Sequence, residues 1–162
     1  MTTLEERPIA ARGDFNRLSG VQQYLTPVLR DLIALAVNGK QAHWHVRGAN
    51  FMGVHEFLDE VVAHAQEASD TIAERIVALG LPVDARIGTV AEHTTTPELS
   101  VGFQQSGVVV REMVAQLDAT LETIYAAVEG LEEIDPVSQD FVIALAQQFD
   151  KDRWFLFSHY AE

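Results

Sequence analysis

Residues 53–79 read GVHEFLDEVVAHAQEASDTIAERIVAL, and this stretch decides the fold. Its apolar residues recur at helical spacing, which predicts one amphipathic helix about 40 Å long. The apolar stripe consists of Phe57, Leu58, Val61, Val62, Ala65, Ile72 and Ile76. Gly80 follows the stretch directly and Pro82 comes two residues later, which is typical of a helix C-terminus. We therefore expect a long helix that packs its apolar face against other helices.

Prolines and turn residues divide the chain on either side of this helix. Thr26 followed by Pro27 predicts the start of a first helix, with the threonine as N-cap and the proline at the first helical position. Residues 21–25 could add a further turn before it. Residues 47–50, Arg-Gly-Ala-Asn, predict the turn between the two helices.

The second half of the chain predicts two more helices. Residues 81–97 form a long polar connection, which is expected to cross the bundle or to contain a short helix of its own. Apolar spacing predicts a third helix over residues 98–130, and Asp135-Pro136 opens a fourth. No segment is predicted to be a strand.

Four long helices with one long connection between the second and third predict an all-α, ferritin-like four-helix bundle. At 162 residues the chain has the length of one domain. We divide it into an N-terminal tail, residues 1–18, and a bundle domain, residues 19–162. Architecture alone does not indicate what the protein does.

The composition restricts the classes of function. The formal charge is −13, and a field of that sign repels nucleic acid and anionic membranes and attracts cations, although it could also serve solubility alone. The absence of cysteine excludes disulfides, zinc ribbons and thiol nucleophiles, and it fits a reducing cytosol. Neither a signal peptide nor an apolar run of about 18 residues is present, so we expect a soluble, cytoplasmic protein without membrane contact.

Polar residues that can bind metal follow one stripe of the helix over residues 53–79. His55 and Asp59 are four residues apart, and so are Asp70 and Glu74, so each pair shares a helix face. Around the helix axis, the three carboxylates lie about 40°, 60° and 100° from His55. Along the axis, Asp59 and Asp70 are about 16 Å apart, which is too far for one metal ion to bridge.

A two-fold axis resolves this separation. If two copies of the helix cross antiparallel between His64 and Ala65, the His55 end of one copy meets the Asp70 end of the other, and each dimer has two identical sites. Several small residues would allow close approach there, namely Ala63, Ala65, Ala68 and Ser69. His43 could add a second imidazole. Two histidines with three carboxylates suit iron or a similar divalent ion better than calcium. The alternative is that the stripe is simply a solvated face.

Motifs of other enzyme classes are incomplete or absent. The stretch from His55 to Asp59 resembles the metalloprotease motif His-Glu-x-x-His, but Asp59 replaces the second histidine. No Glu-x-x-His, Gly-rich phosphate loop or Gly-x-Ser-x-Gly occurs. A metal-assisted hydrolase of amide or ester bonds, which would use the same histidines and carboxylates, remains an alternative.

Three stretches together resemble the Dps family: KQAHWHVRGANF at 40–51, VHEFLD at 54–59 and SDTIAER at 69–75. The resemblance implies a four-helix subunit that assembles into a hollow shell of twelve. It also implies an iron-binding ferroxidase centre at a two-fold interface, with His43, His55 and Asp59 from one subunit and Asp70 and Glu74 from its neighbour. Trp44 matches a family tryptophan beside the centre, which would intercept stray oxidising equivalents; alternatively it is a core aromatic at a helix end.

The family resemblance also implies an activity. Family members oxidise Fe(II) with hydrogen peroxide or oxygen and store the ferric mineral, which protects against oxidative stress. Asp140 matches a position that lines an acidic entry pore, although a carboxylate there also suits the helix dipole. DNA-binding relatives carry a lysine-rich tail, whereas residues 1–15 contain only two basic residues, Arg7 and Arg12. DNA binding is therefore doubtful, and a nucleoid-binding structural role is the weakest alternative.

Overall fold

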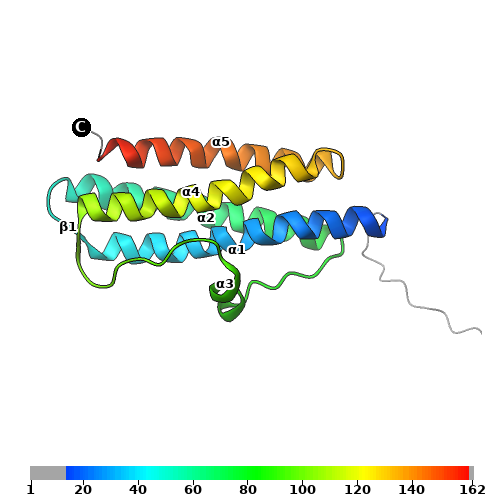
Figure 1. Cartoon of the computed structure of the whole chain (residues 1–162), viewed down its shortest axis with the longest axis horizontal. Helices are drawn as coiled ribbons and strands as arrows, with labels where there is room; N and C mark the ends of the chain where they lie inside the picture. Colours follow the sequence, from blue (N-terminus) through cyan, green and yellow to red (C-terminus); the bar gives the residue numbers. More distant parts are fainter. Residues whose placement is uncertain (1–13, 161–162) are drawn as a thin grey trace, which may run out of the picture.

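Four long helices lie side by side along the length of the molecule (Figure 1). The computed structural model describes residues 14–160. The four helices are α1 (Phe15–His45), α2 (Phe51–Ala78), α4 (Ser106–Leu131) and α5 (Pro136–Ser158). The first, α1, packs against α2 and α4, and α5 packs against α4 and α2, which confirms the predicted four-helix bundle.

The core lies between these helices and is filled mainly by leucine, isoleucine and valine. Its largest fully buried side chains are Phe149, Leu25, Leu29, Leu32, Leu35, Leu58, Ile72, Ile76, Met113, Leu117, Ile124 and Leu131. Every long helix contributes to this set, as expected for helices that each bury one apolar stripe. Within residues 14–160, no helix is both long and apolar enough to cross a membrane.

The first helix begins eleven residues before Thr26, so the predicted start is wrong. The side chain of Asp14 caps α1 by accepting a hydrogen bond from the backbone N–H of Arg17 at 2.9 Å. Pro27 therefore lies inside the helix, where it removes one backbone hydrogen bond. Burial of the preceding apolar residues offsets that loss; these are Leu18, Val21 and Leu25. Residues 15–18, which were predicted to belong to the N-terminal tail, are part of α1.

The predicted end of α2 is confirmed. Gly80 has a φ of 83°, in the left-handed region that favours glycine. Its N–H donates to the carbonyl of Val77 at 2.8 Å, and the N–H of Leu81 donates to the carbonyl of Ile76 at 3.2 Å. These two bonds form a Schellman motif, which satisfies carbonyls that the helix end would otherwise leave unpaired.

The connection between α2 and α4 differs from the prediction in two ways. It contains a short helix, α3 (Ile87–His93), which was one of the two expectations for it. However, α4 begins only at Ser106, so residues 98–105 are not helical, although they were predicted to be. Two short parallel strands, β1 (Val46–Arg47) and β2 (Gln104–Gln105), pair with each other, so the expectation of no strand was also wrong. Gly102, two residues before β2, has a φ of 76°, in the left-handed region that favours glycine.

A buried carboxylate holds this connection on the bundle. Asp31 of α1 is only 1% exposed. It accepts hydrogen bonds from the hydroxyl of Thr94 at 2.8 Å and from both the N–H and the hydroxyl of Thr95 at 2.8 and 2.7 Å. The hydroxyl of Thr123 on α4 donates to it at 2.6 Å. One side chain therefore joins α1, α4 and the segment that follows α3.

A second buried carboxylate joins three helices at one end of the bundle. The fourth long helix, α5, begins at Asp135-Pro136 as predicted, and Asp135 is 1% exposed. Arg17 and Arg75 donate to its two oxygens at 2.9 and 2.7 Å, and the hydroxyl of Ser138 donates at 2.6 Å. Burial opposes ionisation, but these hydrogen bonds outweigh it and lower the pKa of Asp135 to about 2.

This depressed pKa predicts a loss of stability in acid. Because the pKa is lower in the folded than in the unfolded chain, Asp135 stabilises the fold above about pH 4 and loses that contribution as the pH falls toward 2. The wild-type advantage over Asp135→Asn in free energy of unfolding should shrink by about 1 kcal/mol between pH 7 and pH 3. Urea denaturation at both pH values measures it. An advantage that did not change with pH would contradict the prediction.

Candidate metal centre

Two histidines from neighbouring helices form the centre of the candidate site. His43 lies in the last turn of α1 and His55 in the first turns of α2, because the turn at residues 46–50 reverses the chain. The Nδ1 of His43 donates to the carbonyl of His55 at 2.7 Å, and the Nδ1 of His55 donates to the carbonyl of His43 at 2.9 Å. The two rings stack with their centroids 3.7 Å apart.

This reciprocal arrangement sets the tautomer of both imidazoles. A neutral ring whose Nδ1 carries the donated proton has a lone pair on Nε2, which is the nitrogen that can bind a metal. Metal-binding histidines characteristically donate their other ring nitrogen to a carbonyl or carboxylate in this way. His43 is only 7% exposed, so its orientation is also held by packing. The backbone of each histidine therefore orients the ring of the other.

Asp59 adds a carboxylate one turn after His55. Its Oδ1 lies 3.4 Å from the Nδ1 of His43, and its side chain is 50% exposed. Lys40, one turn before His43, donates to the same oxygen at 2.5 Å. That hydrogen bond is the largest influence on the Asp59 carboxyl and lowers its pKa below the usual value. The structure thus places three of the five predicted ligands, His43, His55 and Asp59, near one another, but not in a group that could hold a metal ion by itself.

The other two predicted ligands lie farther along α2. Asp70 and Glu74 are exposed, toward the C-terminal end of the helix. Their distance from Asp59 along the axis is about 16 Å or more, as the residue spacing requires. Within one copy of residues 14–160, no three histidine, cysteine, aspartate or glutamate side chains are grouped so that they could hold a metal ion. One chain alone does not assemble the predicted set.

The two remaining predicted residues are both exposed. Trp44 follows His43 directly, and its side chain is 61% exposed, so it is not a core aromatic of this chain. Asp140 lies exposed in the first turns of α5.

Known proteins resemble this chain over most of its length. The family model described as the ferritin-like domain matches residues 22–162. The DNA protection during starvation protein of Mycolicibacterium smegmatis is 33% identical over 147 residues, covering 88% of this chain and 78% of the relative. The protein of that name from Agrobacterium fabrum is 30% identical and covers 91% of each chain. This chain belongs to the Dps family.

Solved structures of Dps proteins agree with the fold as well. The structure of Dps from Microbacterium arborescens in the high iron form is 51% identical, with a TM-score of 0.91, and covers 94% of this chain and 100% of that one. The ferritin-like fold predicted from the sequence is therefore confirmed. Membership of the Dps family supports a role in iron storage or DNA protection.

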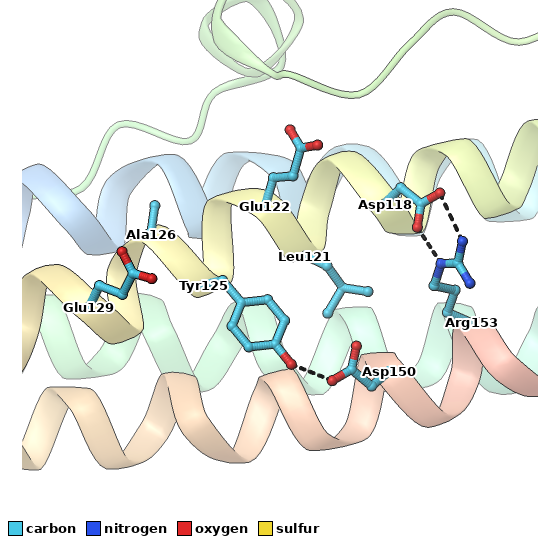
Figure 2. Close-up of a pocket in the computed structure, with 8 residues that line it drawn as sticks. All are labelled: Asp118, Leu121, Glu122, Tyr125, Ala126, Glu129, Asp150 and Arg153. Carbon is cyan, nitrogen blue, oxygen red and sulfur yellow. Dashed lines mark hydrogen bonds and ion pairs between the residues drawn. The ribbon is translucent and has the colours of Figure 1, made fainter.

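A surface hollow of this Dps-family chain lies apart from the candidate ligands. It has a volume of about 610 Å³ and lies between α4 and α5. Figure 2 shows Tyr125 pointing toward Asp150, to which its hydroxyl donates at 2.5 Å, and Arg153 pointing toward Asp118, with which it forms an ion pair. Four of its charged and polar groups are thus paired with one another, and none of the predicted ligands lines it.

Lys40 contacts Asp59 of the candidate site in this Dps-family chain, but no role was predicted for this lysine. It belongs to the stretch that carries the family resemblance, three residues before His43. Residues three apart on a helix share a face, so its nearness to the histidine could have been inferred. Its contact with Asp59 could not, because that contact joins two helices whose relative position only the fold decides.

Proposed function

We propose that this Dps-family chain is a ferroxidase subunit that oxidises Fe(II), with hydrogen peroxide or oxygen as the oxidant. The ferric product would be stored inside a shell of twelve copies, which protects the cell from oxidative stress. The observation that carries this proposal is the reciprocal pair of His43 and His55 with the Asp59 carboxylate beside it. Nitrogen and carboxylate ligands together suit iron.

The complete centre would lie between two subunits. His43, His55 and Asp59 would come from one copy, and Asp70 and Glu74 from the other, since all four of the α2 ligands follow one stripe of that helix. Asp59, Asp70 and Glu74 are exposed, which leaves them accessible to a second copy. The similar Dps structure from Microbacterium arborescens is of a high iron form, which supports the choice of metal.

The residues of the centre would divide the chemistry between them. The three carboxylates would neutralise the charge that iron gains as it passes from Fe(II) to Fe(III), and the imidazoles would hold both oxidation states. Two Fe(II) ions supply the two electrons that reduce one hydrogen peroxide to two molecules of water, with the uptake of two protons. Exposed Trp44, beside His43, would intercept stray oxidising equivalents, and Asp140 would line an entry pore for iron.

Fe(II) titration of the metal-free protein under hydrogen peroxide tests this proposal. We expect rapid oxidation that falls at least tenfold in His55→Ala, because an iron ligand is lost. His93→Ala is the matched control. It also removes an exposed imidazole, but on α3, away from the candidate site. Light scattering on the same samples should show a closed oligomer. Slow oxidation by the wild type, or a fully active monomer, would contradict the proposal, and iron loading also separates it from the hydrolase alternative.

We also propose that DNA is not a strong partner near neutral pH. The net charge of −13 disfavours contact with phosphates. The N-terminal tail on which this expectation partly rests, residues 1–13, lies outside the described part of the chain. A plasmid gel shift at physiological salt, with divalent cations excluded because they could bridge two anions, would show binding if this proposal is wrong.

A further inference from the structure

A histidine that the candidate centre does not use lies on the other side of α2. His64 follows His55 by nine residues, which places it about 13 Å farther along the axis and on the opposite side of the helix. It contacts α5 instead of α1: its Nδ1 lies 2.8 Å from Oδ2 of Asp152, which is 2% exposed. The amide nitrogen of Gln148 donates to the other oxygen of that carboxylate at 2.9 Å. This cluster joins the middle of α2 to α5.

The buried carboxylate sets the tautomer of the His64 imidazole. An ionised Asp152 only accepts hydrogen bonds, so Nδ1 of His64 carries the donated proton and Nε2 keeps its lone pair. Among the described side chains, no buried nitrogen or oxygen lacks a hydrogen-bond partner, and the side-chain contacts of His64 are formed by Nδ1. Nε2 is therefore accessible, and the side chain is 33% exposed. Metal-binding histidines almost always show this arrangement.

A hollow between α2 and α5 lies at this ring. Its volume is about 230 Å³, and its polar side chains are those of His64, Glu67, Thr71 and Gln148. Glu67 is exposed and follows His64 by three residues, so its carboxylate shares a helix face with the imidazole. A water molecule occupies about 30 Å³ of liquid. The hollow therefore has room for a metal ion together with several waters.

The chain does not balance the negative charge of this cluster. Asp152 and Glu67 are both carboxylates, whereas none of the described residues that line the hollow is a lysine or an arginine. Asp135, which is also buried, is paired with two arginines. Asp152 is held only by a neutral amide and by an imidazole. Because a buried charge is costly unless it is paired, the cluster favours a cation at the free nitrogen of His64.

We propose that His64 and Glu67 bind a divalent transition-metal ion in this hollow, with Asp152 orienting the imidazole. An imidazole nitrogen together with a carboxylate oxygen suits Zn(II), Fe(II) and related ions better than calcium or magnesium. Since residues 14–160 of one copy contain no group of three such side chains that could hold a metal ion, water completes the coordination. This site is separate from the pair of His43 and His55, and it does not depend on the proposed ferroxidase activity.

Titration calorimetry of the metal-free protein with Zn(II), which has no redox chemistry, tests this site. The wild type should show a class of Zn(II) sites that His64→Gln loses or binds about tenfold more weakly, since one of two protein ligands is gone. Asp152→Asn keeps an acceptor for Nδ1 but removes its charge, and should weaken the same class about tenfold. His93→Gln is the matched control, because it removes an exposed imidazole that also lies beside a carboxylate, that of Glu92.

Chemical modification locates the ion at the level of single residues. Diethylpyrocarbonate acylates accessible imidazole nitrogens, so bound Zn(II) should slow the modification of His64 several-fold and leave that of His93 unchanged. Glu67→Gln should remove most of this protection, whereas Glu133→Gln, which removes an exposed carboxylate elsewhere, should not. The protection of His64 should persist in His55→Ala, in which the candidate centre lacks a ligand.

The outcomes separate this inference from the proposed function. Equal Zn(II) binding by the wild type and His64→Gln, or modification of His64 at the same rate with and without Zn(II), would overturn the new site, and the cluster would then serve only to join α2 to α5. Protection of His64 together with unchanged Zn(II) binding by His55→Ala would support the new site and count against the candidate centre instead. Sizing and circular dichroism of every variant establish that each has folded.

Discussion

Shells assembled from a mixture of Asp59→Ala and Asp70→Ala subunits should regain part of the Fe(II)-oxidation rate that neither variant shows alone. Each variant by itself has lost one ligand in every shared site. In a dimer that pairs the two variants, one site lacks both aspartates and the other is intact. Half of the dimers in an equal random mixture are of this kind, so about a quarter of all sites should be intact. We expect about a quarter of the wild-type initial rate.

The measurement is the initial rate of oxidation after the two variants are refolded together. Separately refolded variants, mixed afterwards, provide the baseline. A sharper control pairs Asp59→Ala with His55→Ala, because both changes affect the same subunit's half of the site, so every mixed dimer has two defective sites. That pair should give no rescue. An Asp59/Asp70 mixture that stayed at the baseline would show that the ligands do not come from two subunits.

Replacing Asp31 with alanine should lower the free energy of unfolding by about 3 kcal/mol. The carboxylate is 1% exposed and accepts hydrogen bonds from Thr94, Thr95 and Thr123. Alanine would leave the donors of these threonines without their acceptor and create a small cavity. Denaturation in urea measures the change, and hydrogen exchange should show the largest loss of protection around residues 94–96.

A variant of the same shape separates the lost hydrogen bonds from the lost volume. Asp31→Asn keeps one carbonyl oxygen and can still accept from the N–H of Thr95, so it should lose less stability than Asp31→Ala. Asp14→Ala removes an exposed carboxylate from the start of the same helix and should cost about 1 kcal/mol through the lost cap. A loss below 1 kcal/mol for Asp31→Ala would show that this carboxylate does not hold the connection.

The sequence by itself determined the features that depend on residues close together in the chain. The apolar period predicted α2, and Gly80 marked its end because only a local backbone conformation is required there. Asp135-Pro136 marked the start of α5 for the same reason. The spacing of His55 and Asp59, and of Asp70 and Glu74, placed these residues on one helix face, since helical geometry is the same in every helix.

Tertiary structure decided the features that depend on residues far apart in the chain. Pro27 is a local signal for a helix start, yet α1 continues past it because burial of residues that precede the proline outweighs one lost hydrogen bond. The pairing of β1 with β2 joins segments almost sixty residues apart, which no local pattern encodes. The contact between His43 and His55, and that between Lys40 and Asp59, likewise require two helices to be placed against each other. Residue spacing indicates which groups share a face, but only the packing of the helices determines which groups on different helices touch.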